Sequence, residues 1–231
     1  MAAVIEHLRG KITGYDERRK VLKIEAPYED FATLCRREYD EVDISPIDSR
    51  PLSDQQRRNC YAMIREIAVW CGSATQEIKE RLKLDFWCGE LLQMSRSLFS
   101  LSDAPMSVVA AFQKWLARFI VENDVPTRVS LLGYVDDIED YVYACLVNKK
   151  CCICGKHADL HHVEHLGMGA NRDEIIHEGL EVMPLCREHH EEIHTTGKKD
   201  FFELYHLNGG IIADKTICRI YGIKNKEGKK R

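Results

Sequence analysis

The side chains best suited to metal chemistry lie in residues 151–194. Two pairs of metal-binding residues each have a two-residue spacer: Cys151 with Cys154, and Cys186 with His189. Such spacers let both side chains of a tight turn reach one ion, and two pairs complete a tetrahedral zinc site. The alternative is a set of buried thiols without metal, but two matched pairs favour zinc. Cys152 could replace Cys151, although the spacing from Cys154 favours Cys151.

A second group of histidines lies between and after these pairs. His161 and His162 are adjacent in strand-like sequence, whereas His190 and His194 are four residues apart in helix-like sequence. Residues i and i+4 share a helix face, so His190, His194 and His161 could bind one divalent ion with open positions. Side chains alternate along a strand, which leaves His162 on the opposite side as a general base. Metal-assisted phosphodiester hydrolysis needs this combination; a surface cluster or extra structural-zinc ligands are the alternatives.

Composition limits the compartment and the class of protein. The chain has 231 residues, ten cysteines and a net charge of −4. We find no apolar run long enough to cross a bilayer and no apolar region typical of a secretory signal at the N-terminus. We therefore expect a cytoplasmic protein without a membrane partner, in which clustered thiols bind metal rather than form disulfides. With this net charge, contact with nucleic acid requires a local basic patch or a bound metal.

The rest of the sequence predicts an α+β chain in which helices precede the metal-binding stretch. Residues 1–26 predict a small sheet with a turn at residues 13–16, and residues 27–52 are mostly irregular. Ser53 and Gln56 form a capping box for a helix that Gly72 ends. Further helices are expected from about residue 75, within 86–94, over 105–122 with Ser102 and Asp103 as caps, and over 136–148, 199–207 and 214–221.

The metal-binding stretch resembles the HNH nuclease motif, also called the ββα-metal fold. The likeness rests on Cys-x-x-Cys, a paired histidine and Leu-Cys-x-x-His-His-x-x-x-His, and covers about 45 residues. It implies that His162 is the general base and that His161, His190 and His194 bind a catalytic Mg²⁺ or another divalent ion. It also implies that Cys151, Cys154, Cys186 and His189 hold a structural zinc ion that braces the module.

The sequence departs from this motif at one site residue. Many HNH proteins have an asparagine that fixes the loop near the base, and the matching position here is Glu181, nine residues before His190. A carboxylate accepts hydrogen bonds but cannot donate as an amide does. Glu181 could fix the loop as an acceptor, another residue such as Asn171 could take over, or catalysis could be weakened. His165 and His177 are expected to be loop residues rather than ligands.

The first half resembles the NinB/Orf family of phage recombination mediators. The likeness rests on residues 49–70, where a Leu-Ser-x-x-Gln-x-Arg signal opens a helix, and on residues 105–125. It implies a homodimer that binds single-stranded DNA and helps to load a recombinase. Arg57 and Arg58 at the helix start are candidate DNA contacts, with solvated surface as the alternative. We therefore expect an Orf-like domain over 1–145 and a zinc-braced HNH module with a basic tail over 146–231.

Together these features predict a divalent-metal-dependent HNH endonuclease. The whole chain is similar to phage proteins described as HNH nucleases, which implies a role on DNA, single-stranded or branched, in phage or prophage recombination or replication. The alternative is a non-catalytic recombination mediator that binds single-stranded DNA and uses the zinc module as a clamp. A single-strand-binding protein or a recombinase would then be a partner. A transcription regulator ranks last, because we find no clear helix-turn-helix.

Overall fold

The computed structural model describes residues 10–30, 32, 35–36, 44, 48–91, 98–164 and 175–226. The chain divides into two compact units, Met1–Pro46 and Ile47–Arg231. The predicted boundary between residues 145 and 146 lies inside the second unit and stays a prediction. In the described part of the chain, no helix combines the length and apolar character needed to span a membrane.

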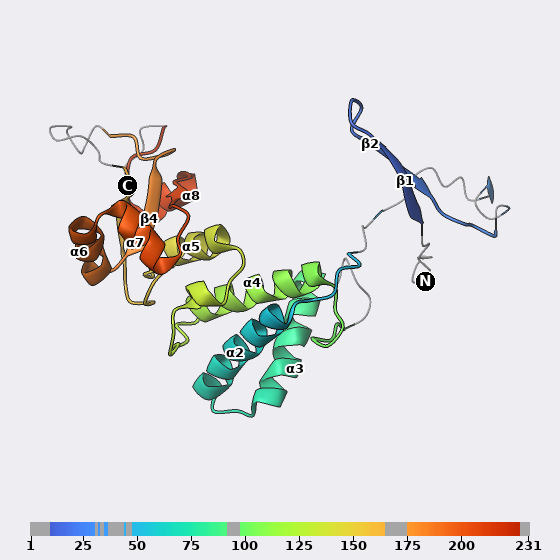
Figure 1. Ribbon diagram of the computed structural model, residues 1–231, viewed down its shortest axis with the longest axis horizontal. Helices are drawn as coiled ribbons and strands as arrows, with labels where there is room; N and C mark the ends of the chain where they lie inside the picture. Colours follow the sequence, from blue (N-terminus) through green and yellow to red (C-terminus); the bar gives the residue numbers. More distant parts are fainter. Residues whose placement is uncertain are drawn as a thin grey trace. The chain divides into compact units, whose positions relative to one another are not determined.

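The first unit contains an antiparallel hairpin of β1 (Lys11–Asp16) and β2 (Val21–Glu25) (Figure 1). The predicted small sheet is present, but the turn predicted at residues 13–16 was wrong. The chain turns at residues 17–20. Residues 13–16 belong to β1, whose pairing with β2 is shifted by a bulge between Ile12 and Gly14. Asp16 explains the position of the turn, because its Oδ1 accepts hydrogen bonds from the backbone N–H groups of Arg18 and Arg19 at 3.1 and 3.0 Å.

The second unit begins with helices that pack on one another (Figure 1). Helix α2 (Asp54–Cys71) has the predicted capping box of Ser53 and Gln56, and it ends at Gly72 in the left-handed conformation with φ 67°. Helix α3 (Thr75–Phe86) runs into a π-helical turn (Trp87–Leu91), and α4 (Met106–Glu122) packs against both α2 and α3. A short 3₁₀ turn (Leu131–Gly133) then precedes α5 (Ile138–Val147).

Helix α4 is capped differently from the prediction. Ser102 and Asp103 lie in a turn, and the N-cap position is Pro105, which offers no side-chain cap. The first N–H groups of the helix are instead satisfied from a distant segment. Asp48 Oδ2 accepts from Ser107 N at 3.1 Å, and the Arg50 carbonyl accepts from Met106 N at 2.9 Å.

The C-terminal part of this unit is an antiparallel sheet in the order β3 (Asp159–His162), β4 (Glu181–Leu185) and β5 (Ile211–Ile212). Helix α6 (Arg187–Thr196) follows β4, and α7 (Lys198–Tyr205) and α8 (Lys215–Tyr221) agree with the two predicted C-terminal helices. The short strand β5 was not predicted.

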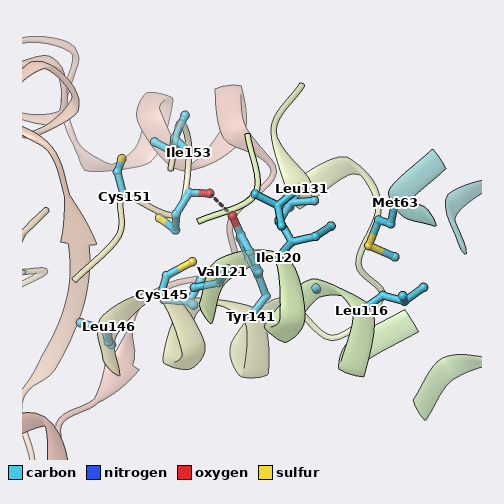
Figure 2. Packing of buried hydrophobic residues seen from close by; sticks show 14 of the residues in the cluster. Met63, Leu116, Ile120, Val121, Leu131, Tyr141, Cys145, Leu146, Cys151 and Ile153 are labelled. Atoms are coloured by element: carbon cyan, nitrogen blue, oxygen red, sulfur yellow. Dashed lines mark hydrogen bonds between the residues drawn. The ribbon is translucent and has the colours of Figure 1, made fainter. Parts of the chain in front are cut away.

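Helix α5 joins the helical part to the sheet. It contacts α4 on one side and β4, β5 and α8 on the other. Tyr141 of this helix is buried, and its hydroxyl donates to the Cys152 carbonyl at 3.0 Å (Figure 2). One buried apolar cluster extends from α2 and α4 through α5 to β4 and α8, which supports the segments that carry the cysteines and histidines predicted to bind metal.

Candidate metal centre

The first cysteine pair lies in a tight turn between α5 and β3. Cys151 N donates to the Lys156 carbonyl at 2.7 Å, and Gly155 N donates to the Cys151 carbonyl at 2.8 Å. Gly155 has φ 71°, a conformation that L side chains rarely adopt, so a glycine at this position closes the turn without strain. The turn presents Cys151 and Cys154 from a fixed backbone loop.

The second pair starts helix α6 and meets the first. Cys186 occupies the N-cap position of α6, and His189 follows in its first turn. The ligand atoms of Cys151, Cys154, Cys186 and His189 all lie within 4.8 Å of one another. The Cys154 Sγ to Cys186 Sγ distance is 3.7 Å, and the Cys151 Sγ to His189 Nδ1 distance is 3.5 Å. The structure therefore brings together the four residues that the spacing predicts.

These separations fit a tetrahedral zinc ion. With zinc bonds of about 2.3 Å to sulfur and 2.0 Å to nitrogen, the edges of a tetrahedron are about 3.8 Å between sulfurs and 3.5 Å from sulfur to nitrogen. The 3.7 and 3.5 Å separations match these edges, and the Cys186 Sγ to His189 Nδ1 separation of 3.1 Å is about 0.4 Å shorter than the ideal edge. Burial raises the pKa of the Cys154 thiol to about 12, and the neighbouring thiols add to this effect. A divalent cation would compensate the thiolate charges, so the Cys₃His cluster is consistent with a zinc site.

Cys152 is not part of this cluster. It is fully buried, and its carbonyl accepts the Tyr141 hydroxyl on the side of α5. Burial raises the pKa of its thiol well above the ordinary value. Of the two cysteines that the sequence left open, Cys151 rather than Cys152 lies with Cys154, Cys186 and His189.

A second cluster consists of three histidines from β3 and α6. The ligand atoms of His161, His190 and His194 lie within 4.8 Å of one another. Their ring centroids are 4.8 Å apart for His161–His190, 5.3 Å for His161–His194 and 4.8 Å for His190–His194. Burial, followed by the charge of His194, lowers the pKa of His190, which favours the neutral imidazole that binds metal. Three nitrogen donors are enough for one divalent ion with open coordination positions.

His162 has a different set of neighbours from His161. The His161 ring meets His190 and His194, whereas His162 Nε2 lies 2.8 Å from His177 Nδ1. Burial, followed by the charge of His177, lowers the pKa of His162 and favours its neutral form. The alternation along β3 therefore separates His161, in the three-histidine cluster, from the neutral imidazole of His162. His177 was expected to be a loop residue, and its place beside His162 depends on a long-range contact that the spacing does not reveal.

The family comparison agrees with this arrangement. A family model described as "Putative HNHc nuclease" matches residues 21–223, which is most of the chain. The chain belongs to this HNH nuclease family. Membership suggests nuclease activity on nucleic acid, and HNH nucleases generally use a divalent metal ion. Comparison with curated proteins found no match, and neither did comparison with solved structures.

Glu181, at the position where the HNH motif often has asparagine, connects two parts of the sheet. Its backbone carbonyl accepts from Val163 N at 3.0 Å, one residue beyond His162. Its Oε1 accepts from Gly210 N at 2.6 Å, just before β5. Gly210 is required there, because a Cβ atom would lie 2.6 Å from the Val182 carbonyl oxygen. The Glu181 side chain thus fixes Gly210 just before β5, while its backbone carbonyl fixes Val163 just after β3. His165 and Asn171 lie outside the described residues.

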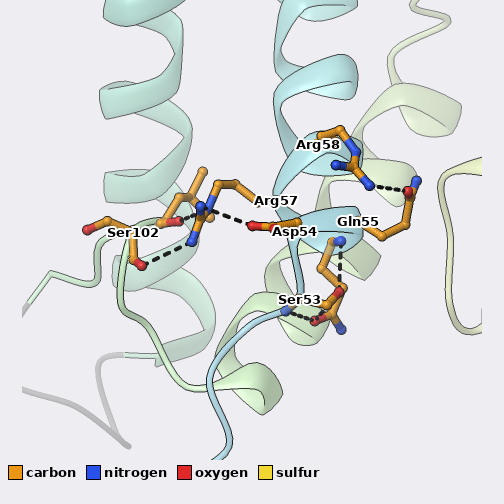
Figure 3. A network of polar contacts seen from close by, with 8 residues as sticks. Ser53, Asp54, Gln55, Arg57, Arg58 and Ser102 are labelled. Carbon is orange, nitrogen blue, oxygen red and sulfur yellow. Dashed lines mark hydrogen bonds and ion pairs between the residues drawn. The ribbon is translucent and has the colours of Figure 1, made fainter.

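The two arginines predicted to contact DNA lie at the start of α2, in the helical part of this HNH family member (Figure 3). Arg57 Nε donates to the Leu101 carbonyl at 3.0 Å, and its terminal nitrogens contact the Ser102 carbonyl and Asp54. Arg58 donates to Gln55 Oε1 at 2.8 Å. Arg57 therefore stabilises the turn before α4. A DNA contact for either arginine stays a prediction.

Proposed function

We propose that the chain is a divalent-metal-dependent endonuclease that cleaves DNA at the three-histidine cluster. The observation that carries this proposal is the juxtaposition of His161, His190 and His194 with a neutral His162 on the same strand. A divalent ion held by the three histidines would bind the scissile phosphate and stabilise the leaving oxygen. The phage or prophage setting of recombination or replication is part of the proposal and rests on the sequence resemblance.

His162 is the proposed general base. In the tautomer in which His162 Nε2 donates to His177 Nδ1, the lone pair of His162 lies on Nδ1. That Nδ1 atom takes a proton from the attacking water, and His177 keeps the ring oriented during the transfer. The Cys₃His cluster, Cys151, Cys154, Cys186 and His189, has a structural role, because it fixes the start of α6 relative to the strand that carries His161 and His162.

A non-catalytic recombination mediator is the second candidate function, and the carboxylate at Glu181 favours it. An amide at this position could both donate and accept, but the Glu181 carboxylate only accepts, and its Oε1 is engaged by Gly210 N. In this alternative the chain is a homodimer that binds single-stranded DNA through an Orf-like region over residues 1–145 and works with a recombinase or a single-strand-binding protein. The zinc-braced part over residues 146–231 then serves as a DNA clamp.

A cleavage assay with His162→Ala separates these functions. Supercoiled, single-stranded and branched DNA are incubated with the parent and the variant in the presence of Mg²⁺, Mn²⁺ or Ni²⁺. Loss of a positioned general base should reduce the rate by ~10²–10⁴-fold without changing zinc content or DNA affinity. His157→Ala is the matched control, because His157 is exposed and lies outside both clusters.

His190→Ala tests the metal role in the same assay. This variant should also stop cleavage, but through loss of the catalytic ion, so excess metal should restore part of the activity. If the parent protein binds DNA yet cuts no substrate with any of the three metals, the nuclease proposal fails and the mediator function stands.

A further inference from the structure

A small cavity in the helical part carries more positive than negative charge. It has a volume of about 210 Å³ and lies between α2, α3 and the segment before α4. Three cationic side chains line it, Arg57, Lys79 and Lys83, against one carboxylate, Glu80. Neither metal-ligand cluster contributes a residue to this cavity.

The two lysines are unusual for a helix surface. Lys79 and Lys83 are four residues apart on α3, where like charges repel. Their side chains are only 14% and 11% exposed. Each ammonium also lies 5.7 Å from an aromatic ring centroid, Lys79 over Tyr61 and Lys83 over Phe99. Packing of this kind holds both cations at the cavity instead of letting them extend into solvent.

Glu80 compensates only part of this charge. Its two carboxylate oxygens contact Lys79 Nζ at 3.2 Å and Lys83 Nζ at 3.1 Å. Hydrogen bonds from Lys83 and then Lys79 lower the pKa of Glu80, so the carboxylate stays ionised. The lining has three cations and one anion, and Asp54, which pairs with Arg57 at 3.3 Å, reduces the local net charge to +1. A bound anion would relieve the repulsion that this arrangement creates.

The other lining groups suit a phosphate. Ser100 and Ser102 are both at the cavity, and their hydroxyl oxygens are 2.8 Å apart. One hydroxyl donates to the other, which leaves a hydroxyl hydrogen for an oxygen in the cavity. The volume of about 210 Å³ lies below the roughly 300–1,000 Å³ of sites for drug-sized ligands. The cavity therefore has room for a single phosphate group.

We propose that this cavity binds one phosphate group of the nucleic acid on which the chain acts. The inference rests on the proposed function, because it assigns the phosphate to a nucleic acid, and it adds an anchoring site away from the histidine cluster. Lys79 and Lys83 supply charge, Arg57 fixes the cavity wall through Leu101 and Ser102, and a serine hydroxyl donates to a phosphate oxygen.

The test compares three charge changes in the full-length chain. All proteins carry His162→Ala so that DNA is not cut, and affinity for a labelled single-stranded oligonucleotide is measured by fluorescence anisotropy at several salt concentrations. Lys79→Gln should weaken binding about tenfold, the size expected for one charge-assisted hydrogen bond, and should reduce the salt slope by about 0.7–1. Glu80→Gln removes the compensating carboxylate and should strengthen binding. Lys114→Gln is the matched control, because Lys114 lies on α4 and pairs with Asp137 and Asp140.

The opposite effects of Lys79→Gln and Glu80→Gln separate binding from folding. Loss of either side chain breaks the same ion pair, so a purely structural role would weaken both proteins alike and could not raise affinity. Equal affinities and salt slopes for Lys79→Gln and Lys114→Gln, or weaker binding by Glu80→Gln, would overturn the inference.

Two further measurements identify the source of the phosphate and separate this inference from the nuclease proposal. If an oligonucleotide with a 5′-phosphate binds more tightly than its 5′-hydroxyl form, the cavity binds the phosphate at a strand end. If both forms bind equally and Lys79→Gln still weakens binding, the cavity binds an internal phosphate. Inorganic phosphate at matched ionic strength should compete with the oligonucleotide for binding to the parent more strongly than for binding to Lys79→Gln. If chains without His162→Ala cut no DNA but these effects persist, the nuclease proposal fails alone. If those chains cut DNA and Lys79→Gln binds like Lys114→Gln, the phosphate site fails alone.

Discussion

Cys186→Ser tests the zinc assignment at the ligand that connects both halves of the cluster. Cys186 Sγ lies 3.1 Å from His189 Nδ1 and 3.7 Å from Cys154 Sγ. The residue also joins the buried end of β4 to the first turn of α6. A serine hydroxyl is a poor zinc ligand compared with a thiolate, so the substitution should release the ion and detach α6 from the Cys151–Cys154 turn.

The expected loss of stability is large. Structural zinc contributes about 10–16 kcal/mol in small zinc-binding peptides, and whole domains are stable by only about 5–15 kcal/mol. Losing even half of the zinc contribution should unfold the segment of β3, β4 and α6. The helical part should survive, because Met63, Ile64, Phe112 and Leu116 have no exposed surface and pack within α2 and α4.

Cys152→Ser is the matched control for this substitution. Cys152 is fully buried two residues from Cys154 but lies outside the ligand cluster. Burying a hydroxyl there should cost about 1–3 kcal/mol and leave the zinc in place.

Elemental analysis after dialysis against a weak chelator gives the zinc content, and hydrogen exchange reports the protection of β3, β4 and α6. Dialysis removes ions from open sites, so about one zinc per chain should remain in the parent and in Cys152→Ser. Retention of zinc and protection by Cys186→Ser, or equal zinc loss from both variants, would refute the assignment.

Three further predictions concern single contacts. Tyr141→Phe should lower the free energy of unfolding by about 1–3 kcal/mol in urea titrations, because it removes the donor to the buried Cys152 carbonyl, and zinc content should not change. Glu181→Asn should hold or raise cleavage while losing the bond to Gly210 N, so the melting temperature should fall by about 2–4 °C; loss of cleavage at an unchanged melting temperature would contradict this. Hydrogen bonds from Arg50 lower the pKa of Asp48, so Asp48→Asn should be less stable than the parent at pH 7. This difference in urea midpoint should shrink as the pH falls below about 4, and a difference that grows would contradict the assignment.

Local patterns in the sequence predicted the elements that depend on neighbouring residues. The capping box of Ser53 and Gln56 and the stop at Gly72 are formed by residues within one turn of the helix end, so sequence spacing contains the necessary information. The same holds for Cys186 with His189 and for His190 with His194, whose relative positions the helix period determines.

Features that depend on distant residues could not be predicted in this way. Asp48 caps α4 from 59 residues away, and local spacing does not reveal this contact. Local spacing instead favoured Ser102 and Asp103, because they lie directly before the helix in the sequence. His177 reaches His162 across 15 residues, and no local period relates them. The hairpin turn was misplaced for a different reason, because Gly14 has turn chemistry but lies at a bulge.

Helix α6 also determines which mutations this region can tolerate. His189 and His190 are consecutive residues, yet one belongs to the Cys₃His cluster and the other to the three-histidine cluster. Each helical residue adds a rise of about 1.5 Å and a rotation of about 100°. A reading-frame-preserving insertion or deletion of one residue between His189 and His194 would therefore turn one set of ligands away from its partners. Substitutions at the exposed Glu191 leave this spacing intact. Both clusters therefore depend on the length of this segment, which substitutions on its exposed face do not change.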